Sequence, residues 1–202
     1  MKQKNKNDIQ YGRFEKVLLH ICCAPDATYP VFYLRGRHYK VTGFFYNPNI
    51  HPITEYEKRV NEIKRFANIV KFPLIEGPYD IKEWFEYIKG LENEPEGGKR
   101  CYKCYEFRLE KTAQLAKKLH FDYFTTTLSI SPHKNSKWIF EIGHNLEEQY
   151  GVKFLKADFK KRNGFKSSVI LSKYYGMYRQ NYCGCIFSKI EAEKWRAAHR
   201  ES

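Results

Sequence analysis

Residues 16–26 have the sequence KVLLHICCAPD, a short apolar run that ends at two adjacent cysteines. Apolar runs of this length, bounded by polar segments, are typical of strands that are buried on both faces of a parallel sheet. Residues 16–21 are therefore predicted to form the first strand. The further predicted strands are residues 40–46 (KVTGFFY), 69–75 (IVKFPLI), 121–129 (FDYFTTTLS) and a strand within 152–159 (VKFLKADF).

Segments with helical periodicity separate the predicted strands. Residues 54–67 place apolar side chains at helical spacing, and Thr54 is the expected N-cap. The other predicted helices are residues 30–34, 81–90 after a cap at Asp80, 104–119, a helix to residue 150 capped by Asn135 or Ser136, 164–174 and 188–198. This alternation predicts an α/β fold, a doubly wound and mostly parallel sheet with helices on both faces.

Chain length and composition limit the domain organisation. A chain of 202 residues is long enough for one well-filled core, so residues 16–202 are predicted to form a single α/β catalytic domain after a polar tail at 1–15. We expect no signal peptide, because the first residues are polar, and no membrane-spanning helix, because no apolar run is long enough. Grouped cysteines favour a cytoplasmic location, where thiols stay reduced.

The chain is strongly basic. It has 36 lysine and arginine residues against 23 aspartate and glutamate residues, which gives a formal net charge of +13. Such an excess favours a polyanionic partner, because phosphate contacts release counterions, and the 16 tyrosines offer faces that can stack on unpaired bases. A lysine-rich surface around an aromatic core is the alternative explanation. Composition therefore favours a nucleic acid partner, and no membrane partner is expected.

Six cysteines form three closely spaced pairs, which is the pattern expected of a metal or redox site. The pairs are Cys22 with Cys23, Cys101 with Cys104 in a C-x-x-C motif, and Cys183 with Cys185 in a C-x-C motif. Residues at i and i+3 of a helix face the same way, so the C-x-x-C sulfurs can point at one centre. The first two pairs supply the four thiolates that a [4Fe–4S] cluster takes, and a zinc site has the same requirement. Spacing alone is compatible with either metal.

The C-x-C pair has two interpretations. Residues at i and i+2 are close enough in space for a small, strained disulfide, and Gly184 between them permits the unusual dihedrals that such a ring needs. A strained disulfide is easily reduced, so Cys183 and Cys185 could store two electrons. Alternatively, the same two sulfurs bind a second metal ion, with Asp26 as an oxygen ligand.

Other polar side chains are predicted to lie where the strands end, which is where doubly wound sheets bind ligands. Asp26 follows the first predicted strand and is a candidate general acid or metal ligand, with a helix N-cap as the alternative. His133 and Lys134 follow the fourth predicted strand, where they contact phosphate or substrate unless they form a solvated loop. Arg108 lies one helical turn beyond Cys104 and faces a cluster or substrate, or else forms a surface ion pair.

Three further features are weaker candidates. His20 lies within the first predicted strand and is expected to be a core histidine. The basic run at 160–162 is expected to be a solvated turn that can also contact RNA backbone. Tyr182, beside the C-x-C pair, either stacks on a base or packs against its neighbours.

Four stretches together resemble one known family. HICCAPD (20–26), RCYKCYEFRL (100–109), TTTLSISPHKN (125–135) and YRQNYCGCIFS (178–188) resemble the cobalamin-independent epoxyqueuosine reductases, the QueH family. The resemblance extends from about residue 17 to about residue 188. It implies a fold related to the adenine-nucleotide α-hydrolase-like fold of PP-loop ATP pyrophosphatases. Because CCAPD stands where the ATP-using relatives have an SGGxDS phosphate loop, ATP use is not expected.

The resemblance also implies an activity and a set of roles. The expected enzyme is an oxidoreductase that reduces the epoxide of epoxyqueuosine in tRNA, the last step of tRNA queuosine biosynthesis. Its expected partners are tRNA that carries epoxyqueuosine at the anticodon wobble position and an unidentified electron donor. By this resemblance Cys22, Cys23, Cys101 and Cys104 hold a [4Fe–4S] cluster. Cys183 and Cys185 are then the redox-active pair or, together with Asp26, the ligands of an additional iron ion.

Two other functions are compatible with the same sequence features. A tRNA thiolation enzyme on a PP-loop-like fold would show ATP pyrophosphatase activity. A non-catalytic RNA-binding module with structural zinc would be colourless after anaerobic purification, whereas an iron–sulfur protein would be brown and contain iron and sulfide.

Overall fold

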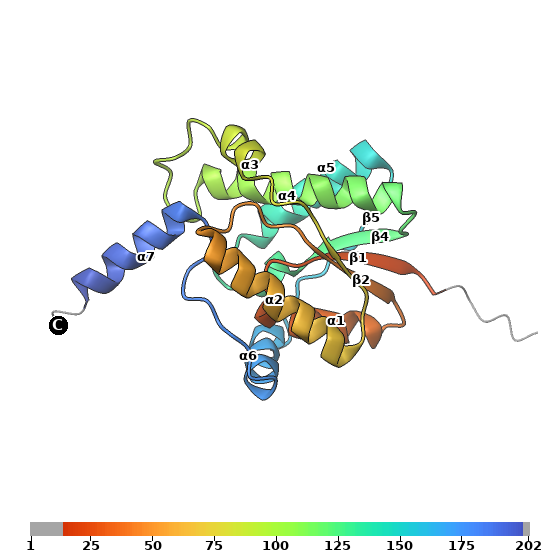
Figure 1. Cartoon of the computed structure of the whole chain (residues 1–202). Coiled ribbons are helices and arrows are strands. Elements are labelled where there is room, and N and C mark those ends of the chain that lie inside the picture. Colours follow the sequence, from red (N-terminus) through yellow and green to blue (C-terminus); the bar gives the residue numbers. More distant parts are fainter. Residues whose placement is uncertain (1–13, 200–202) are drawn as a thin grey trace, which may run out of the picture.

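A five-stranded parallel sheet lies at the centre of the computed structural model, which describes residues 14–199 (Figure 1). The strands are β1 (Lys16–His20), β2 (Lys40–Phe45), β3 (Leu74–Glu76), β4 (Tyr123–Thr126) and β5 (Lys153–Phe154), in the order β3-β2-β1-β4-β5. The central strand β1 pairs in parallel with both β2 and β4. The strand order therefore reverses beside β1, and ligands bind beyond the carboxyl end of such a strand.

Helices cover both faces of the sheet, so the predicted doubly wound α/β fold is confirmed (Figure 1). One face carries α1 (Ala24–Arg35), α2 (Ile53–Val70) and α6 (Gly164–Tyr174). The other face carries α3 (Ile81–Tyr87), α4 (Lys99–Lys118) and α5 (Ser136–Tyr150). The last helix, α7 (Ile186–Ala198), extends away from the sheet (Figure 1).

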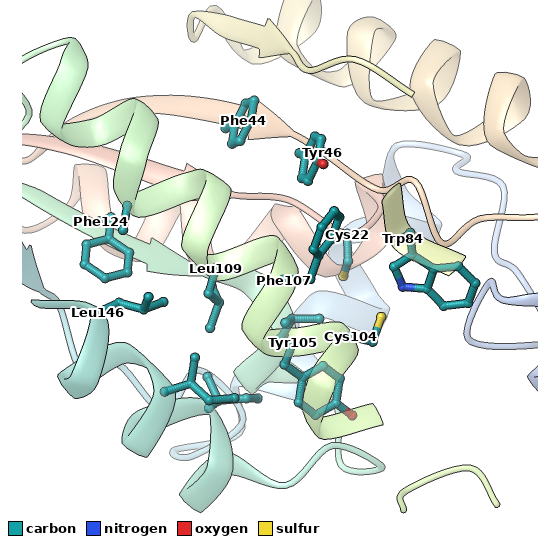
Figure 2. Packing of buried hydrophobic residues seen from close by; sticks show 14 of the residues in the cluster. Cys22, Phe44, Tyr46, Trp84, Cys104, Tyr105, Phe107, Leu109, Phe124 and Leu146 are labelled. Atoms are coloured by element: carbon teal, nitrogen blue, oxygen red, sulfur yellow. The ribbon is translucent and has the colours of Figure 1, made fainter. Parts of the chain in front are cut away.

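Side chains of β1 alternate between the two faces, as the two-residue period of a strand requires. Val17 and Leu19 pack in the cluster with α1 and α2, whereas Leu18 packs in the cluster with α4 and α5. Figure 2 shows this second cluster, in which Phe107 and Leu109 of α4 pack with Phe44 of β2 and Phe124 of β4. Each buried side chain of this size contributes roughly 1.5–3 kcal/mol. Apolar packing on both faces thus fixes the carboxyl end of β1.

Four helices begin earlier than the sequence predicts. α2 begins at Ile53 with Pro52 at its N-cap, so the expectation of Thr54 as the N-cap is wrong. α1 begins at Ala24 rather than at Pro30, because Pro25 occupies the first turn, where a missing N–H is tolerated. Pro30 lies inside the helix. α4 begins at Lys99 rather than at residue 104, and α7 begins at Ile186 rather than at residue 188. The early start of α4 places the whole C-x-x-C motif within its first two turns.

The strands are shorter than predicted. The strand expected at 69–75 is only Leu74–Glu76, because α2 continues through Val70 and ends at Lys71 in the left-handed conformation, with φ of 55°. The fourth strand ends at Thr126, where the Thr126 hydroxyl accepts a hydrogen bond from Leu128 N and begins the 3₁₀ helix η1 (Thr127–Ile130). The fifth strand has two residues. The third predicted strand is therefore shortened by the continuation of α2, and the fourth by the Thr126 cap.

Most of the expected polar tail, residues 1–13, lies outside the described part of the chain. Within residues 14–199, every helix is too short or too polar to cross a bilayer. The single domain expected for 16–202 stays a prediction.

Candidate active site

A cavity of about 600 Å³ opens at the carboxyl ends of the central strands. Cys22 follows β1, Asn47 follows β2, and Lys134 follows η1 after β4, and all three line the cavity. Cys183, from the segment between α6 and α7, also lines it. Loops from distant parts of the chain therefore line one cavity at this edge of the sheet.

Cys22, Cys23 and Asp26 lie close together, and we call these three residues the compact group. Their sulfur and carboxylate atoms all lie within 4.8 Å of one another. Cys22 Sγ lies 3.3 Å from Asp26 Oδ2 and 3.2 Å from Thr127 Oγ1, and Gln180 Nε2 donates to Cys23 Sγ at 3.0 Å. Cys23, not Asp26, occupies the N-cap position of α1, so the N-cap interpretation of Asp26 is wrong. The compact group offers the two soft sulfurs and one hard oxygen of a single-metal site.

The two thiols of the compact group differ in acidity. A hydrogen bond from Cys23 lowers the pKa of the Cys22 thiol, whereas burial raises the pKa of the Cys23 thiol well above its usual value. Both lie at the N-terminus of α1, whose dipole favours negative charge. Cys22 is therefore the sulfur of this pair that ionises first, and the thiolate is the form that binds metal.

A second, smaller cavity, of about 10 Å³, lies beside the first, and we call it the sulfur chamber. Four cysteines line the sulfur chamber: Cys101, Cys104, Cys183 and Cys185. The first two come from one turn of α4, and the last two from the loop that leads into α7. All six cysteines of the chain are free thiols in this structure. Thiolates of a cluster bind different iron atoms, so they surround a larger space than the ligands of one ion.

Backbone contacts hold the C-x-C loop against α2 and the loop after β2. Gly184 adopts φ of +142°, which confirms that this position needs an unusual conformation, and its carbonyl accepts from His51 N at 2.8 Å. Arg59 donates to the Cys183 carbonyl at 2.8 Å and forms a buried ion pair with Glu55 at 2.7 Å. Arg59 thereby ties the Cys183 backbone to α2.

Burial raises the pKa of two chamber thiols, to about 11 for Cys183 and about 12 for Cys101. These groups are therefore protonated at neutral pH until a cation replaces the protons, as metal binding to thiols requires. Five thiols line the two cavities, Cys23 and the Asp26 carboxylate lie beside Cys22, and this donor set fits an iron–sulfur cofactor.

The two cavities form one continuous site, because Cys183, Asn49, Glu96 and Arg108 line both. In Figure 2, Cys22 after β1 and Cys104 on α4 point into the same region beside Trp84. The structure thus brings Cys22 near the sulfur chamber. A ligand that entered the large cavity would lie next to the sulfur atoms of both the compact group and the sulfur chamber.

Arg108 and Lys134 are the charged side chains that lie between the sulfur groups. Arg108 is 2% exposed, so the interpretation as a surface ion pair is wrong. Burial opposes the charge of Lys134, but the neighbouring Cys183, Cys22 and Asp26 raise its pKa. Lys134 therefore stays a cation at the wall of the large cavity, which His133 also lines.

The remaining predicted candidates have mainly structural contacts. His20 is fully buried, with Nδ1 2.8 Å from Thr126 Oγ1 and Nε2 3.2 Å from the Tyr46 carbonyl, so it is the expected core histidine. Within 160–162, Lys160 donates to two loop carbonyls, whereas the other two side chains are exposed. Tyr182 lines the large cavity, with the Arg59 guanidinium 5.3 Å from its ring centre.

Several cavity residues were not predicted from the sequence. Asn47 and Asn49 follow β2, so their position after a strand end was a usable signal. Gln180 precedes the C-x-C pair and contacts Cys23 only through the fold. Arg59 had no signal, since its pairing with Glu55 at i,i+4 also occurs on exposed helix faces.

Solved structures share the fold at low sequence identity. A predicted subunit of tRNA methyltransferase from Methanocaldococcus jannaschii has a TM-score of 0.52 at 12% identity and matches 79% of this chain and 75% of its own. The U34-tRNA thiolase NcsA from Methanococcus maripaludis, solved with its [4Fe-4S] cluster, has a TM-score of 0.54 at 10% identity and matches 93% and 67%. The chain is an α/β protein with a doubly wound parallel sheet and with thiols at the switch point of that sheet.

Sequence comparison identifies the family within this class. The profile described as "Epoxyqueuosine reductase QueH" matches residues 17–191. The epoxyqueuosine reductase QueH of Thermotoga maritima is 44% identical over 184 residues, which cover 90% of this chain and 94% of the relative. The relative of the same name from Streptococcus pyogenes serotype M1 is 44% identical over 180 residues, with 85% and 69% covered. The chain belongs to the epoxyqueuosine reductase QueH family, as its motifs predicted.

Proposed function

We propose that this protein reduces epoxyqueuosine in tRNA to queuosine, the last step of tRNA queuosine biosynthesis. The observation that carries the proposal is a site of six thiols at the sheet switch point in a member of a family of reductases. The reaction breaks the C–O bonds of an epoxide on a cyclopentane ring, takes up two electrons and two protons, releases water and leaves a cyclopentene. These electrons must come from thiols, a metal centre or an external donor.

The proposed cofactor is a [4Fe–4S] cluster held by Cys22, Cys23, Cys101 and Cys104. When bound, such a cluster supplies single electrons, and an additional iron ion polarises oxygen as a Lewis acid. The opposed positions of Cys22 and Cys104 in Figure 2 support this ligand set. Cys183 and Cys185 are then the redox-active pair, which closes to a disulfide as it gives up two electrons, or ligands of the additional iron with Asp26.

A second ligand set uses the same seven side chains differently. The sulfur chamber is lined by Cys101, Cys104, Cys183 and Cys185, which favours these four as the cluster ligands. The compact group of Cys22, Cys23 and Asp26 would then hold the additional iron. Cys101 and Cys104 of α4 bind the cluster in both sets. The sets differ only in whether Cys22 and Cys23 or Cys183 and Cys185 supply the other two thiolates.

Polar side chains of the large cavity are proposed to bind the substrate and handle its protons. Lys134 Nζ makes no hydrogen bond or ion pair with residues 14–199 and is available to donate to the oxygen that leaves the epoxide. Asn181 and Arg179 at the same wall offer hydrogen bonds to a base. Preorganised donors of this kind stabilise the negative charge that develops on oxygen.

The proposed partner is tRNA that carries epoxyqueuosine at the anticodon wobble position. An anticodon base lies in an exposed loop and can be turned out of its stack into a cavity, and a net charge of +13 favours contact with the backbone. The electron donor is proposed to be a separate molecule. The proposed location is the cytoplasm, where thiols stay reduced.

Anaerobic reconstitution tests this function. Wild-type protein loaded with iron and sulfide is expected to convert epoxyqueuosine to queuosine in tRNA, which mass spectrometry of the digested tRNA would detect. Cys101→Ala is expected to lose both the cluster and turnover. Cys183→Ala is expected to lose turnover and keep the cluster. A brown, loaded wild type that leaves epoxyqueuosine intact with a chemical reductant would contradict the proposal.

The same preparation distinguishes the alternative functions. ATP pyrophosphatase activity would favour a tRNA thiolation enzyme on the same fold. A colourless protein that purifies anaerobically with zinc would favour a structural RNA-binding module.

A further inference from the structure

Arg108 and Arg100 each have a buried guanidinium nitrogen without a hydrogen-bond partner within residues 14–199, but of these two only Arg100 also has a carboxylate partner. Arg108 Nε donates to the Cys104 carbonyl at 3.1 Å and its Nη1 donates to Asn47 Oδ1 at 3.2 Å. Its Nη2 is buried and has no hydrogen-bond partner within residues 14–199. A buried donor without a partner is strongly unfavourable, so this nitrogen indicates that something is bound beside it.

Arg108 also lacks an acidic partner, unlike the other two buried arginines. Arg59 pairs with Glu55 at 2.7 Å, and Arg100 pairs with Glu191 at 3.1 Å. The contacts of Arg108 in the described part of the chain are a carbonyl, an amide oxygen and the ring of Tyr105 at 5.9 Å. A buried guanidinium without a counter-charge is energetically costly. Glu96 lines the same two cavities but forms no ion pair with Arg108 within residues 14–199, so we expect the counter-charge to come from the thiols or from a group bound to them.

The position of Arg108 fits this requirement. It lines both the large cavity and the sulfur chamber, and the thiols that act on its charge are Cys104, Cys183 and Cys22. Its unpaired Nη2 is shielded from solvent, although the large cavity is open. The unpaired Nη2 therefore belongs to a buried side chain that borders both groups of sulfur atoms.

We infer that Arg108 is a positioning residue that balances the negative charge of the sulfur-bound metal centre and makes that centre easier to reduce. The inference rests on the proposed iron–sulfur cofactor, and it holds for either ligand set, because Cys104 belongs to both. Reduction adds one negative charge to the centre. A fixed buried cation beside it stabilises the reduced state more than the oxidised state.

Two variants test the effect of this charge, one by removing it and the other by placing a counter-charge beside it. Arg108→Gln deletes the guanidinium and keeps a hydrogen-bond donor. Asn47→Asp keeps Arg108 and places a carboxylate at the atom that already accepts from Nη1. The midpoint potential of anaerobically loaded protein would be titrated with dithionite and redox dyes in the absence of tRNA. Both variants are expected to shift the reduction equilibrium at least tenfold toward the oxidised state, a potential about 59 mV more negative for one electron.

Arg100→Gln is the matched control. It removes an equally buried guanidinium from the same helix and the same chamber, but one whose charge Glu191 already balances. Its midpoint potential is expected to change less than twofold in equilibrium. A shift as large as that of Arg108→Gln would show that any buried arginine has this effect, and it would overturn the inference.

The remaining outcomes also support or overturn the role inferred for Arg108. If Arg108→Gln folds but does not load, Arg108→Lys must load and keep a potential near that of the wild type, because it keeps the charge. Failure of the lysine variant overturns the inference, as do unchanged potentials in both Arg108→Gln and Asn47→Asp. An inactive wild type whose potential responds as expected would refute the proposed function and leave this inference intact.

Discussion

The compact group and the sulfur chamber are built differently from the chain. Cys22, Cys23 and Asp26 lie within five consecutive residues, and one strand end with one helix start positions all three. The sulfur chamber joins α4 to a loop about eighty residues further along, and it depends on contacts from α2 and from the loop after β2. The first group is local in sequence, whereas the second depends on tertiary structure.

This difference has a chemical counterpart. The compact group contains a hard oxygen and a thiol with a lowered pKa, and it borders the open cavity. The sulfur chamber is lined by four thiols and by the Glu96 carboxylate, and burial raises the pKa of Cys183 and Cys101. One region suits a single ion that meets substrate, and the other suits a shielded electron carrier. The predictions below test this division.

The largest effect is expected from Cys22→Ala. If Cys22 is a cluster ligand, the variant loses sulfide, brown colour and turnover, a loss larger than the roughly 10–100-fold effect of changing a residue behind a ligand. If the cluster lies wholly in the sulfur chamber, the variant keeps its sulfide and loses only iron. Iron and sulfide counts per chain distinguish these results, and Cys183→Ala is the reciprocal variant.

Asp26→Asn is expected to weaken binding of the additional iron by about 10–100-fold and to leave the sulfide content unchanged. The substitution keeps the size of the side chain and removes the charge of the hard oxygen donor beside Cys22. Iron content after dialysis against a weak chelator measures the effect. Asp80→Asn, which changes a carboxylate at the start of α3, is the control. An iron content equal to that of the control would exclude Asp26 as a ligand.

Gly184→Ala is expected to destabilise the protein by about 1–3 kcal/mol. An alanine would be strained at φ of +142°, and its Cβ would lie 3.1 Å from both Arg59 Nη1 and Ile50 Cγ1. Urea unfolding measures the change. Gly90→Ala is the matched control, because Gly90 also has positive φ but no atom within 4 Å of the added Cβ. Equal losses in the two variants would show that contact with Arg59 is unimportant for the C-x-C loop.

How far the sequence predicted the site follows the same division. The strand that ends at Cys22 and the neighbouring carboxylate Asp26 are contiguous, so periodicity and spacing were enough to place them. The helix that carries Cys101 and Cys104 was predicted to begin too late, because no side-chain cap marks its start at Gly98. Even so, the i,i+3 spacing correctly placed both sulfurs on one side.

The residues that close the sulfur chamber could not be predicted. Arg59 and Glu55 have the spacing of an exposed ion pair, and only the packing of α2 buries them. The sequence did not decide whether Arg108 lies in the site or on the surface, because the burial of a charged side chain depends on what surrounds it in space. The resemblance to a family located the cysteines, but the contacts that hold them come from long-range packing.

The smallest expected effect concerns His51, in the loop that holds Gly184. Both ring nitrogens are buried without a hydrogen-bond partner in the described part of the chain, and the ring centre lies 5.4 Å from that of Trp84 and 5.1 Å from that of Phe85. His51→Phe removes the unpaired polar atoms from this aromatic contact. We expect a gain of about 1 kcal/mol in the free energy of unfolding at neutral pH.

The gain from His51→Phe is also expected to grow as the pH falls. Burial lowers the pKa of His51 below the value of about 6.5 that histidine has in an unfolded chain. Below that pH the unfolded wild type binds more protons at this site than the folded protein, so the wild type loses stability that the phenylalanine variant keeps. Urea midpoints from pH 8 to pH 5 would measure this. His51→Gln cannot titrate but keeps buried polar atoms, so it is expected to lose the pH effect without the gain at neutral pH. Parallel pH profiles for wild type and His51→Phe would contradict the prediction and would mean that the His51 ring is hydrated.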